Sequence, residues 1–378
     1  MKIKPKSLAV AISVFTCLML CELMTRLLAP PWLHQRMAVL TARGESPDGV
    51  GTDRQWKVER KNGRFFSFTP QQSFDVLHDE YHNVAHIDEL GGRRTVIDGN
   101  LRSSLIVMLG DSFTFGVGVK DTETFVNIIA TRIPQYRFIN LGVPGSALPQ
   151  QLDILRERQD ELKPIAYVFF FFLGNDFADI LQSSNIMAYD PLDDFLRKVD
   201  DQICRNYLLE HSYSIQVICA SLPISVVATR PWFELPRDPV FYVMDRSMAR
   251  YQQLAAAALA NQLRTLADLQ RSMHFKSIIV AVPDVNQLSN RHRKLQADSY
   301  GVPFAQLEAS RPNAILAREV QEADLLLFDP TPCMGTSVPE MEALYYRHDN
   351  HFRPLGHEIF ANCVTKEIAK LLSKEASK

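Results

Sequence analysis

The chain lacks an excess of charge of either sign, because its 41 Lys and Arg residues are balanced by 43 Asp and Glu, giving a net charge of −2. Nucleic-acid-binding proteins usually carry a clear basic excess or stripe, so this balance argues against that class. No apolar run after the first thirty residues is long enough to span a bilayer, which excludes a multi-pass transporter. The sequence also has no internal repeat and no low-complexity tract. Its length of 378 residues therefore predicts two globular domains, or one elaborated domain.

Cysteine is scarce and shows neither a CxxC pair nor a metal-ligand spacing. Two of the six cysteines, Cys17 and Cys21, belong to the apolar N-terminal segment. The other four are Cys204, Cys219, Cys333 and Cys363. Cys204 and Cys219 could form a disulfide in an oxidising compartment, and buried free thiols are at least as good an interpretation of that pair.

The first thirty residues have the layout of a signal sequence. Lys2, Lys4 and Lys6 precede an apolar run that continues past Glu22 and Arg26 to position 28. No small-x-small cleavage site follows, so we expect residues 1–30 to be an uncleaved signal anchor, a transmembrane helix. The lysines favour a cytoplasmic N-terminus, which would place the body outside the cytoplasm, in the periplasm of a Gram-negative source. A cleaved signal peptide is the alternative and gives the same compartment.

The rest of the chain divides into a short extension and a regular α/β body. Residues 31–103 are polar, with strand-like pieces at 65–68 and 81–87, and predict a small β-rich extension. From residue 104 onward, apolar runs that end at glycine or proline alternate with amphipathic segments. Residues 183–245 interrupt this alternation and are interpreted as an insertion, a cap over the site. The expected strands are 104–109, 137–141, 166–173, 277–282 and 325–328; the expected helices are 122–132, capped by Asp121 or Thr122, 148–162, 246–272 and 355–372.

Alternating strands and helices predict a parallel sheet with right-handed crossovers. In such sheets the functional site forms at the carboxyl ends of the strands. Three polar blocks follow the first three strands of the body, and a fourth precedes the last helix. The sequence therefore predicts that all four blocks meet at one edge of the sheet. The blocks are GDSFTFG at 110–116, NLGVPGS at 140–146, GND at 174–176 and DNH at 349–351.

These blocks contain the parts of a serine nucleophile site. Ser112 follows a buried strand, where its hydroxyl is presented at the sheet edge. His351 could take its proton, and Asp349 could hold the imidazole in the required tautomer. Asn175 offers an amide donor, and the glycines of the second block let backbone approach a substrate.

Taken together, the four blocks resemble the SGNH/GDSL hydrolase superfamily, in its membrane-anchored, extracytoplasmic type with an Asp-x-His pair. The resemblance covers 105 to the end of the chain. It implies a flavodoxin-like three-layer α/β/α sandwich with Ser112 as nucleophile, His351 as base and Asp349 as its partner. It also implies an oxyanion hole made of the backbone N–H groups of Ser112 and Gly145 and the side chain of Asn175.

Two departures from the family pattern leave alternatives open. Many members have Asp-x-x-His, but His348 stands three residues before His351, so Asp349 is the expected acid. Gly142 remains an alternative to Gly145 as oxyanion donor. An α/β-hydrolase is excluded because its G-x-S-x-G motif fails at Thr114.

Each of these motifs can also be interpreted without catalysis. Gly-Asp-Ser occurs in ordinary turns, and Asn175 and Asp176 could simply cap a helix. A metal site is an alternative for His348, Asp349, His351 and His357. Their spacing offers no further ligand, and a metal site would leave the Ser112 block unexplained. The joint occurrence of the blocks at successive strand ends favours catalysis.

The expected function is ester hydrolysis, without metal or organic cofactor, with the removal of acetyl or another short acyl group from an envelope glycan as the expected reaction. An O-acyltransferase using the same acyl-enzyme and a non-enzymatic envelope scaffold are the alternatives. The expected partners are an ester substrate, such as an acylated polysaccharide or lipid, and the membrane through the N-terminal helix, with no nucleic acid.

Overall fold

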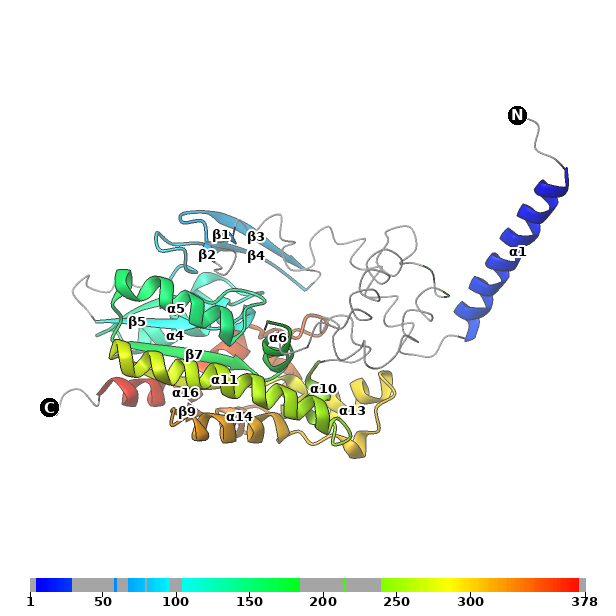
Figure 1. Cartoon of the computed structure of the whole chain (residues 1–378). Coiled ribbons are helices and arrows are strands. Elements are labelled where there is room, and N and C mark those ends of the chain that lie inside the picture. The colour runs from blue at the N-terminus through cyan, green and yellow to red at the C-terminus, as the bar shows by residue number, and fades with distance from the viewer. Residues whose placement is uncertain are drawn as a thin grey trace.

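The computed structural model shows an α/β body with a helix set apart at the N-terminus (Figure 1). Most of the predicted insertion at 183–245, including Cys204 and Cys219, lies outside the described residues. The structure describes residues 5–28, 58–59, 67–78, 80–95, 104–183, 212, 214 and 239–373.

Five parallel strands form the central sheet in the order β6-β5-β7-β8-β9. In chain order this is 2-1-3-4-5, the flavodoxin-like arrangement. The order reverses between β5 and β7, and the carboxyl ends at that point form the crevice in which ligands bind in this fold. The strands are β5 (Leu105–Leu109), β6 (Arg137–Asn140), β7 (Ala166–Phe172), β8 (Lys276–Val282) and β9 (Leu327–Phe328).

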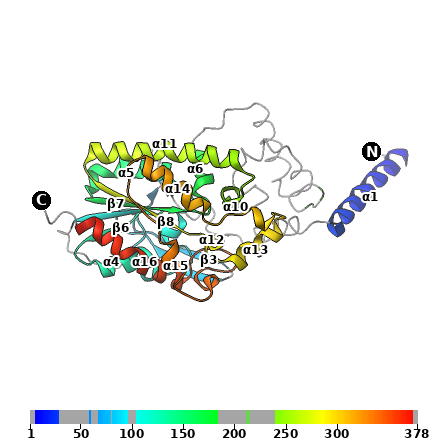
Figure 2. The same cartoon turned by 90° about the horizontal axis from the view of Figure 1, so that it is seen from below.

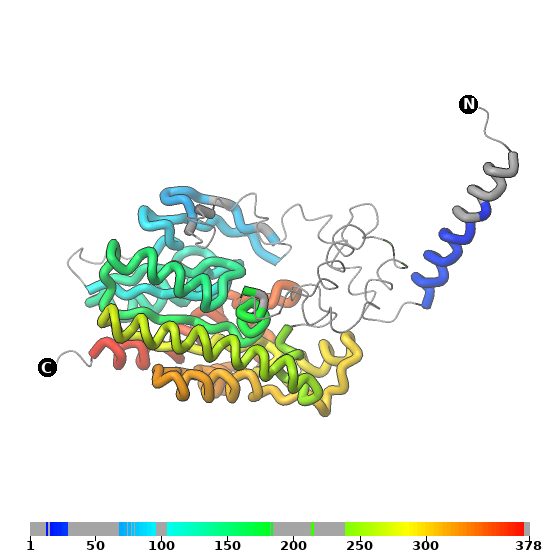
Figure 3. Tube along the Cα trace, viewed as in Figure 1, coloured from blue at the N-terminus to red at the C-terminus, as the bar shows by residue number. Residues whose placement is uncertain are grey.

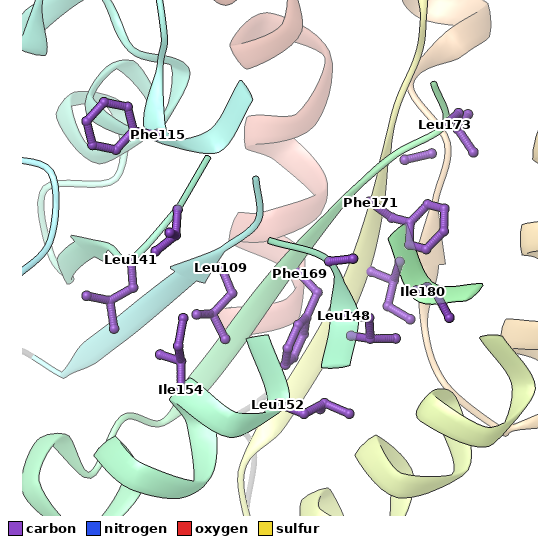
Figure 4. Packing of buried hydrophobic residues seen from close by; sticks show 14 of the residues in the cluster. Leu109, Phe115, Leu141, Leu148, Leu152, Ile154, Phe169, Phe171, Leu173 and Ile180 are labelled. Atoms are coloured by element: carbon purple, nitrogen blue, oxygen red, sulfur yellow. The ribbon is translucent and has the colours of Figure 1, made fainter. Parts of the chain in front are cut away.

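Strand β7 explains why the sheet lies at the centre of the body. All seven of its residues, AYVFFFF, are buried, as expected of a parallel strand covered on both faces. Because successive side chains point to opposite faces, Phe169 and Phe171 join one apolar cluster and Phe170 and Phe172 the other. Figure 4 shows the first of these clusters, with Leu109, Phe169 and Phe171 packed against Leu148 and Leu152.

Helices cover both faces of the sheet, so the predicted three-layer α/β/α sandwich is confirmed (Figure 2). The first face carries α5 (Leu148–Leu162), α6 (Asp176–Ser183), α11 (Ala249–Met273) and α14 (Arg311–Glu322). The second face carries α4 (Phe125–Arg132) and α16 (Pro354–Ser373), whose Phe360, Val364 and Ile368 face the sheet. The shorter elements are α3 (Ser112–Phe115), α10 (Pro239–Met244), α12 (Val285–Leu288), α13 (Asn290–Ser299), α15 (Thr331–Met334), η1 (Asp121–Glu123), η4 (Phe304–Gln306) and η5 (Met341–Leu344).

Some predicted helix limits were wrong. Helix α4 begins three residues later than expected, because Asp121 starts a turn of 3₁₀-helix and Thr124 is the N-cap, accepting a hydrogen bond from the backbone N–H of Asn127. Helices α12, α13 and α14 were not predicted from the sequence.

The described part of the extension is a β-hairpin next to a two-residue pair. Strands β3 (Ser73–His78) and β4 (Tyr81–His86) pair antiparallel, and β1 (Val58–Glu59) pairs with β2 (Ser67–Phe68). Figure 3 shows the hairpin in blue beside the body, to which Asn83 of β4 is joined by a hydrogen bond from its side chain to the carbonyl of Gly118. Only β2 and β4 of these strands were predicted.

The N-terminal segment is helical, as α1 (Pro5–Leu28), with an ion pair between Arg26 Nε and Glu22 Oε1 at 2.8 Å. Within the described residues, however, no helix has the combination of length and apolar character needed to cross a bilayer. The prediction of a transmembrane anchor is therefore not supported. The helix carries an acid and a base one turn apart in its last third, and charged side chains are costly inside a bilayer.

Cys333 and Cys363 form a disulfide that links α15 to α16, with Cα atoms 5.9 Å apart. This disulfide was not predicted from the sequence, which suggested a pair only for Cys204 and Cys219. Thirty positions separate the two cysteines, and sequence spacing alone gives no sign that α16 returns to α15. The closed loop contains the whole DNH block.

Candidate active site

Ser112 is the first residue of the short helix α3, directly beyond the carboxyl end of β5. The Asp111 carboxylate caps this helix by accepting a hydrogen bond from the backbone N–H of Phe113 at 2.9 Å. The helix ends after one turn at Gly116, whose φ of 88° lies in the left-handed region that favours glycine. The GDSFTFG block therefore forms a tight strand-to-helix turn that presents the serine at the sheet edge.

A fully buried arginine holds the backbone that follows Ser112. Arg93, which lies in the segment between β4 and β5, is 0% exposed. Its Nε donates to Asp121 Oδ1 at 2.8 Å. Its two terminal nitrogens donate to three backbone carbonyls, those of Phe115, Gly116 and Val119. This residue was not predicted, because no local pattern indicates that an arginine of the extension enters the core.

The NLGVPGS block packs directly against the serine turn. The backbone N–H of Val143 and the hydroxyl of Ser146 both donate to the carbonyl of Gly110, at 2.9 and 3.0 Å. The Gly142 N–H donates to Oδ1 of Asn140, the last residue of β6, at 3.0 Å. At Gly145, in contrast, φ is +74° and an added Cβ would meet no atom within 4 Å. Of the two candidate donors, Gly142 is thus already engaged, whereas Gly145 borders open space.

The GND block stands at the end of β7, on the other side of β5. Asp176 begins α6 and accepts a hydrogen bond from the backbone N–H of Phe172 at 2.9 Å, a structural role. Burial is the main cause that raises the pKa of Asp111 to about 6 and those of Asp176 and Asp179 well above their usual values. Asn175 is half-buried, at the same edge of the sheet as Gly145 and Ser112.

The structure brings Ser112, His351 and Asp349 into one hydrogen-bonded row. Nε2 of His351 lies 2.8 Å from Ser112 Oγ, and its Nδ1 lies 2.8 Å from Asp349 Oδ2. Ser112 and His351 are 239 positions apart in the sequence. Asn350, between the acid and the histidine, has a φ of 62°, in the left-handed region that asparagine enters more readily than most residues.

The electrostatics of this row are those of a histidine paired with a buried carboxylate. Burial alone would lower the pKa of His351, but the charge and hydrogen bond of Asp349 raise it above the usual value. Burial would raise the pKa of Asp349, yet His351 and the hydrogen bonds from His351 and Tyr81 hold it below the usual value. Asp349 therefore stays ionised and favours the tautomer of His351 that carries its proton on Nδ1.

The other histidines near the motif lie elsewhere. His348 is exposed, and His357 is buried in α16, where its Nδ1 accepts a hydrogen bond from the backbone N–H of Phe125 at 3.1 Å. Burial, followed by the charges of Arg93 and His351, lowers the pKa of His357 to about 3. Across the described residues, no group of three or more His, Cys, Asp or Glu side chains could hold a metal ion. The metal-site alternative thus gains no support.

Comparison with known proteins identifies the family. Residues 106–364, more than half of the chain, match the sequence model of the GDSL-like lipase/acylhydrolase family. No curated protein gives a significant match.

Solved structures with similar folds include a lipase/acylhydrolase from Enterococcus faecalis, at 16% identity and a TM-score of 0.38 over 70% of this chain and 95% of that one. An acetyl xylan esterase from Geobacillus stearothermophilus is similar at 12% identity and a TM-score of 0.36, over 70% of this chain and 95% of that one. An α/β hydrolase enzyme from the metagenome of Lake Arreo, Spain, matches at 14% identity and a TM-score of 0.38, over 71% and 96% of the two chains.

The match spans the sheet, the serine turn and the DNH block. This chain belongs to the GDSL-like lipase/acylhydrolase family, the SGNH hydrolases, and is an enzyme that hydrolyses ester bonds.

Proposed function

We propose that the protein is a serine ester hydrolase that works through an acyl-enzyme on Ser112. One observation carries the proposal: an unbroken row of hydrogen-bonding distances from Ser112 Oγ through both nitrogens of His351 to Asp349 Oδ2. A serine hydroxyl is a weak nucleophile until an adjacent base takes its proton, and a histidine needs a fixed tautomer to do so. This row supplies both conditions.

In the first half of the reaction, Ser112 Oγ attacks the ester carbonyl carbon and its proton passes to His351 Nε2. The tetrahedral intermediate collapses when the alcohol leaves with the proton that His351 returns to it. Water then attacks the acyl-Ser112 ester, giving its proton to His351, and the acid leaves as Ser112 Oγ regains that proton. Asp349 stays ionised throughout and stabilises the imidazolium.

The oxyanion hole in this proposal combines the N–H groups of Ser112 and Gly145 with the amide of Asn175. Two features support it: the Gly142 N–H already donates to Asn140, and the space beside Gly145 is open. The donors come from the ends of β5, β6 and β7, three adjacent strands. Preorganised donors of this kind typically contribute a factor of about 100 to 1000 each to turnover.

For the substrate, we propose an ester of a short acyl group on an extracytoplasmic glycan, with the protein working outside the cytoplasm. The Cys333–Cys363 disulfide supports the compartment, because disulfides persist mainly in oxidising spaces. The lysine-flanked apolar segment at the N-terminus supports it independently, as the layout of an export signal.

The test compares the wild-type protein with Ser112→Ala and with Ser272→Ala as a matched serine control. Ser272 lies on α11, where its hydroxyl donates to the carbonyl of Leu269. We expect a fluorophosphonate probe to label the wild type and Ser272→Ala but not Ser112→Ala. We also expect Ser112→Ala to lose hydrolysis of p-nitrophenyl acetate. Labelling of Ser112→Ala at the wild-type rate would overturn the nucleophile assignment, and release of acetate from an acetylated oligosaccharide would test the substrate class.

A further inference from the structure

The tip of the β3–β4 hairpin reaches the loop that carries Asp349. Tyr81, the first residue of β4, donates a hydrogen bond from its hydroxyl to Asp349 Oδ2 at 2.7 Å. This is the same oxygen that lies 2.8 Å from His351 Nδ1. Two donors from distant parts of the chain therefore share one carboxylate oxygen.

The Tyr81 ring is held in place by packing, with its hydroxyl directed at Asp349 Oδ2. Its side chain is 8% exposed, and its ring packs against Tyr346 with centroids 4.7 Å apart. Burial, followed by the charge and hydrogen bond of Asp349, raises the pKa of Tyr81 above its usual value. The hydroxyl therefore keeps its proton at neutral pH and donates it to the carboxylate oxygen.

The neighbouring Glu80 holds the backbone of the same loop. Its Oε1 accepts a hydrogen bond from the N–H of Arg347 at 2.8 Å. Its Oε2 accepts from the N–H groups of His348 and Asp349, at 2.7 and 3.3 Å. One carboxylate thus fixes three successive peptide groups just before His351. Charge-assisted hydrogen bonds of this kind are about twice as strong as neutral ones.

The hairpin also contacts the nucleophile side of the site. Asn83 Nδ2 donates to the carbonyl of Gly118, which also accepts a hydrogen bond from the hydroxyl of Tyr346 at 2.7 Å. The hairpin therefore bridges the serine segment and the DNH loop. Its position relative to both halves of the site is fixed by these bonds.

We propose that the hairpin is a positioning element of the active site, in which Tyr81 tunes the basicity of His351 through Asp349 while Glu80 fixes the loop. The inference rests on the proposed function of Ser112 and His351. The Tyr81 hydroxyl withdraws part of the carboxylate's charge from His351. Its removal should leave Asp349 more basic, strengthen its hold on the imidazolium and raise the pKa of His351.

Other charged and titratable groups face this pair, and the experiment must leave them unchanged. Asp111 interacts with His351 from the serine turn, and His357 does so from α16. His78 from β3 acts on Asp349, while Glu80 acts on Tyr81. Tyr81→Phe removes one hydroxyl and none of these groups.

The test compares Tyr81→Phe with Tyr345→Phe as a matched control. Tyr345 is buried beside Tyr346 in the sequence. Its hydroxyl donates to the backbone carbonyl of Pro283 at 2.8 Å and not to the triad. We expect Tyr81→Phe to lower kcat about 3- to 10-fold with KM nearly unchanged, because the interaction acts on the base and not on substrate binding. We expect the midpoint of the acid limb of kcat/KM to move to higher pH by about half a unit.

The direction of the pH shift distinguishes tuning from simple structural support. Activity requires neutral His351, so a higher pKa means that activity is lost at a higher pH as the solution is acidified. Tyr345→Phe should keep the wild-type midpoint even where its thermal stability falls. A midpoint for Tyr81→Phe that is unchanged, or lower, would overturn the tuning by Tyr81.

A second variant tests Glu80 independently. In Glu80→Gln an amide can accept through only one oxygen, so at least one of the three loop N–H groups loses its acceptor. We expect a several-fold fall in kcat, with the acid-limb midpoint close to that of the wild type because Glu80 does not touch Asp349 Oδ2. Wild-type kcat would overturn its role. If Ser112→Ala remains active, the proposed function itself fails; if only Tyr81→Phe behaves as wild type, the inference alone fails.

Discussion

The two halves of the proposed active site are held in different ways. The nucleophile segment, residues 112–119, lies on the end of a central strand and is anchored from inside by Arg93, which is completely buried. The acid–base segment, residues 346–351, lies in a loop before the last helix. It is anchored from outside by Glu80 and Tyr81, two residues of the hairpin.

This difference shows which part of the site depends on the core and which depends on the extension. A buried arginine with four acceptors contributes to stability, so the nucleophile segment should not move without unfolding the body. The Glu80 bonds to the acid–base loop are exposed, and the Tyr81 bond involves a single hydroxyl, so both can be removed with the fold intact. Changes at Arg93 should therefore appear mainly as lost stability, and changes at Glu80 and Tyr81 mainly as altered kinetics.

The largest effect is expected from Arg93→Met, which tests the core side of the comparison. The change removes the guanidinium donors from three buried carbonyls and from Asp121, whose other carboxylate oxygen lies 2.6 Å from His86 Nδ1. Removing one member of a buried ion pair typically costs about 3 to 5 kcal/mol, so we expect a large fall in the urea midpoint, or no folded protein.

Two further variants keep this test informative. Arg93→Lys retains the charge but not the planar fork of donors. Its urea midpoint should lie between those of the wild type and Arg93→Met. Arg271→Met removes an exposed arginine, paired with Asp268 on α11, and should change stability by less than about 0.5 kcal/mol. An Arg93→Met protein with the urea midpoint of Arg271→Met would refute the anchoring role.

The next effect concerns the disulfide that encloses the acid–base loop. Replacing Cys333 and Cys363 by Ala opens a loop whose ends are 30 positions apart, and we expect the free energy of unfolding to fall by about 2 to 4 kcal/mol. Dithiothreitol should lower the melting temperature of the wild type but not that of the double variant. Equal sensitivity of the two proteins to the reductant would show that this disulfide does not stabilise the fold.

Sequence alone was sufficient for the elements whose signals are local. Buried parallel strands are short apolar runs, so β5, β7 and β8 were predicted to within one residue at each end. Helix α5 was predicted over the residues it occupies, 148–162. The four polar blocks were also visible, since each stands at the end of a strand or just before a helix.

The contacts that hold the site could not be predicted in the same way. Arg93, Glu80 and Tyr81 act over 22 or more positions, and no local pattern indicates which distant residues they contact. The Cys333–Cys363 disulfide could not be predicted either, because it depends on how α16 packs against α15 in the fold. The sequence thus predicts candidates for the reacting groups but not the residues whose hydrogen bonds hold them in place.

The smallest effect is expected at Asn350, and it tests whether the acid–base loop is shaped by its own backbone as well as by the hairpin. Its φ of 62° costs an alanine about 1 kcal/mol, whereas glycine adopts it freely. We expect Asn350→Ala to lose stability by about that amount and to lower kcat several-fold, and Asn350→Gly to do neither.

Asp324, beyond the end of α14, provides the matched control for this strain. Its φ of 55° is nearly the same, but it lies before β9 and far along the chain from the reacting groups. Asp324→Ala should therefore lose about 1 kcal/mol of stability in urea unfolding while keeping the wild-type kcat. If Asn350→Ala also kept the wild-type kcat at the same loss of stability, the left-handed residue would serve the fold alone, and the hairpin would be sufficient to place His351.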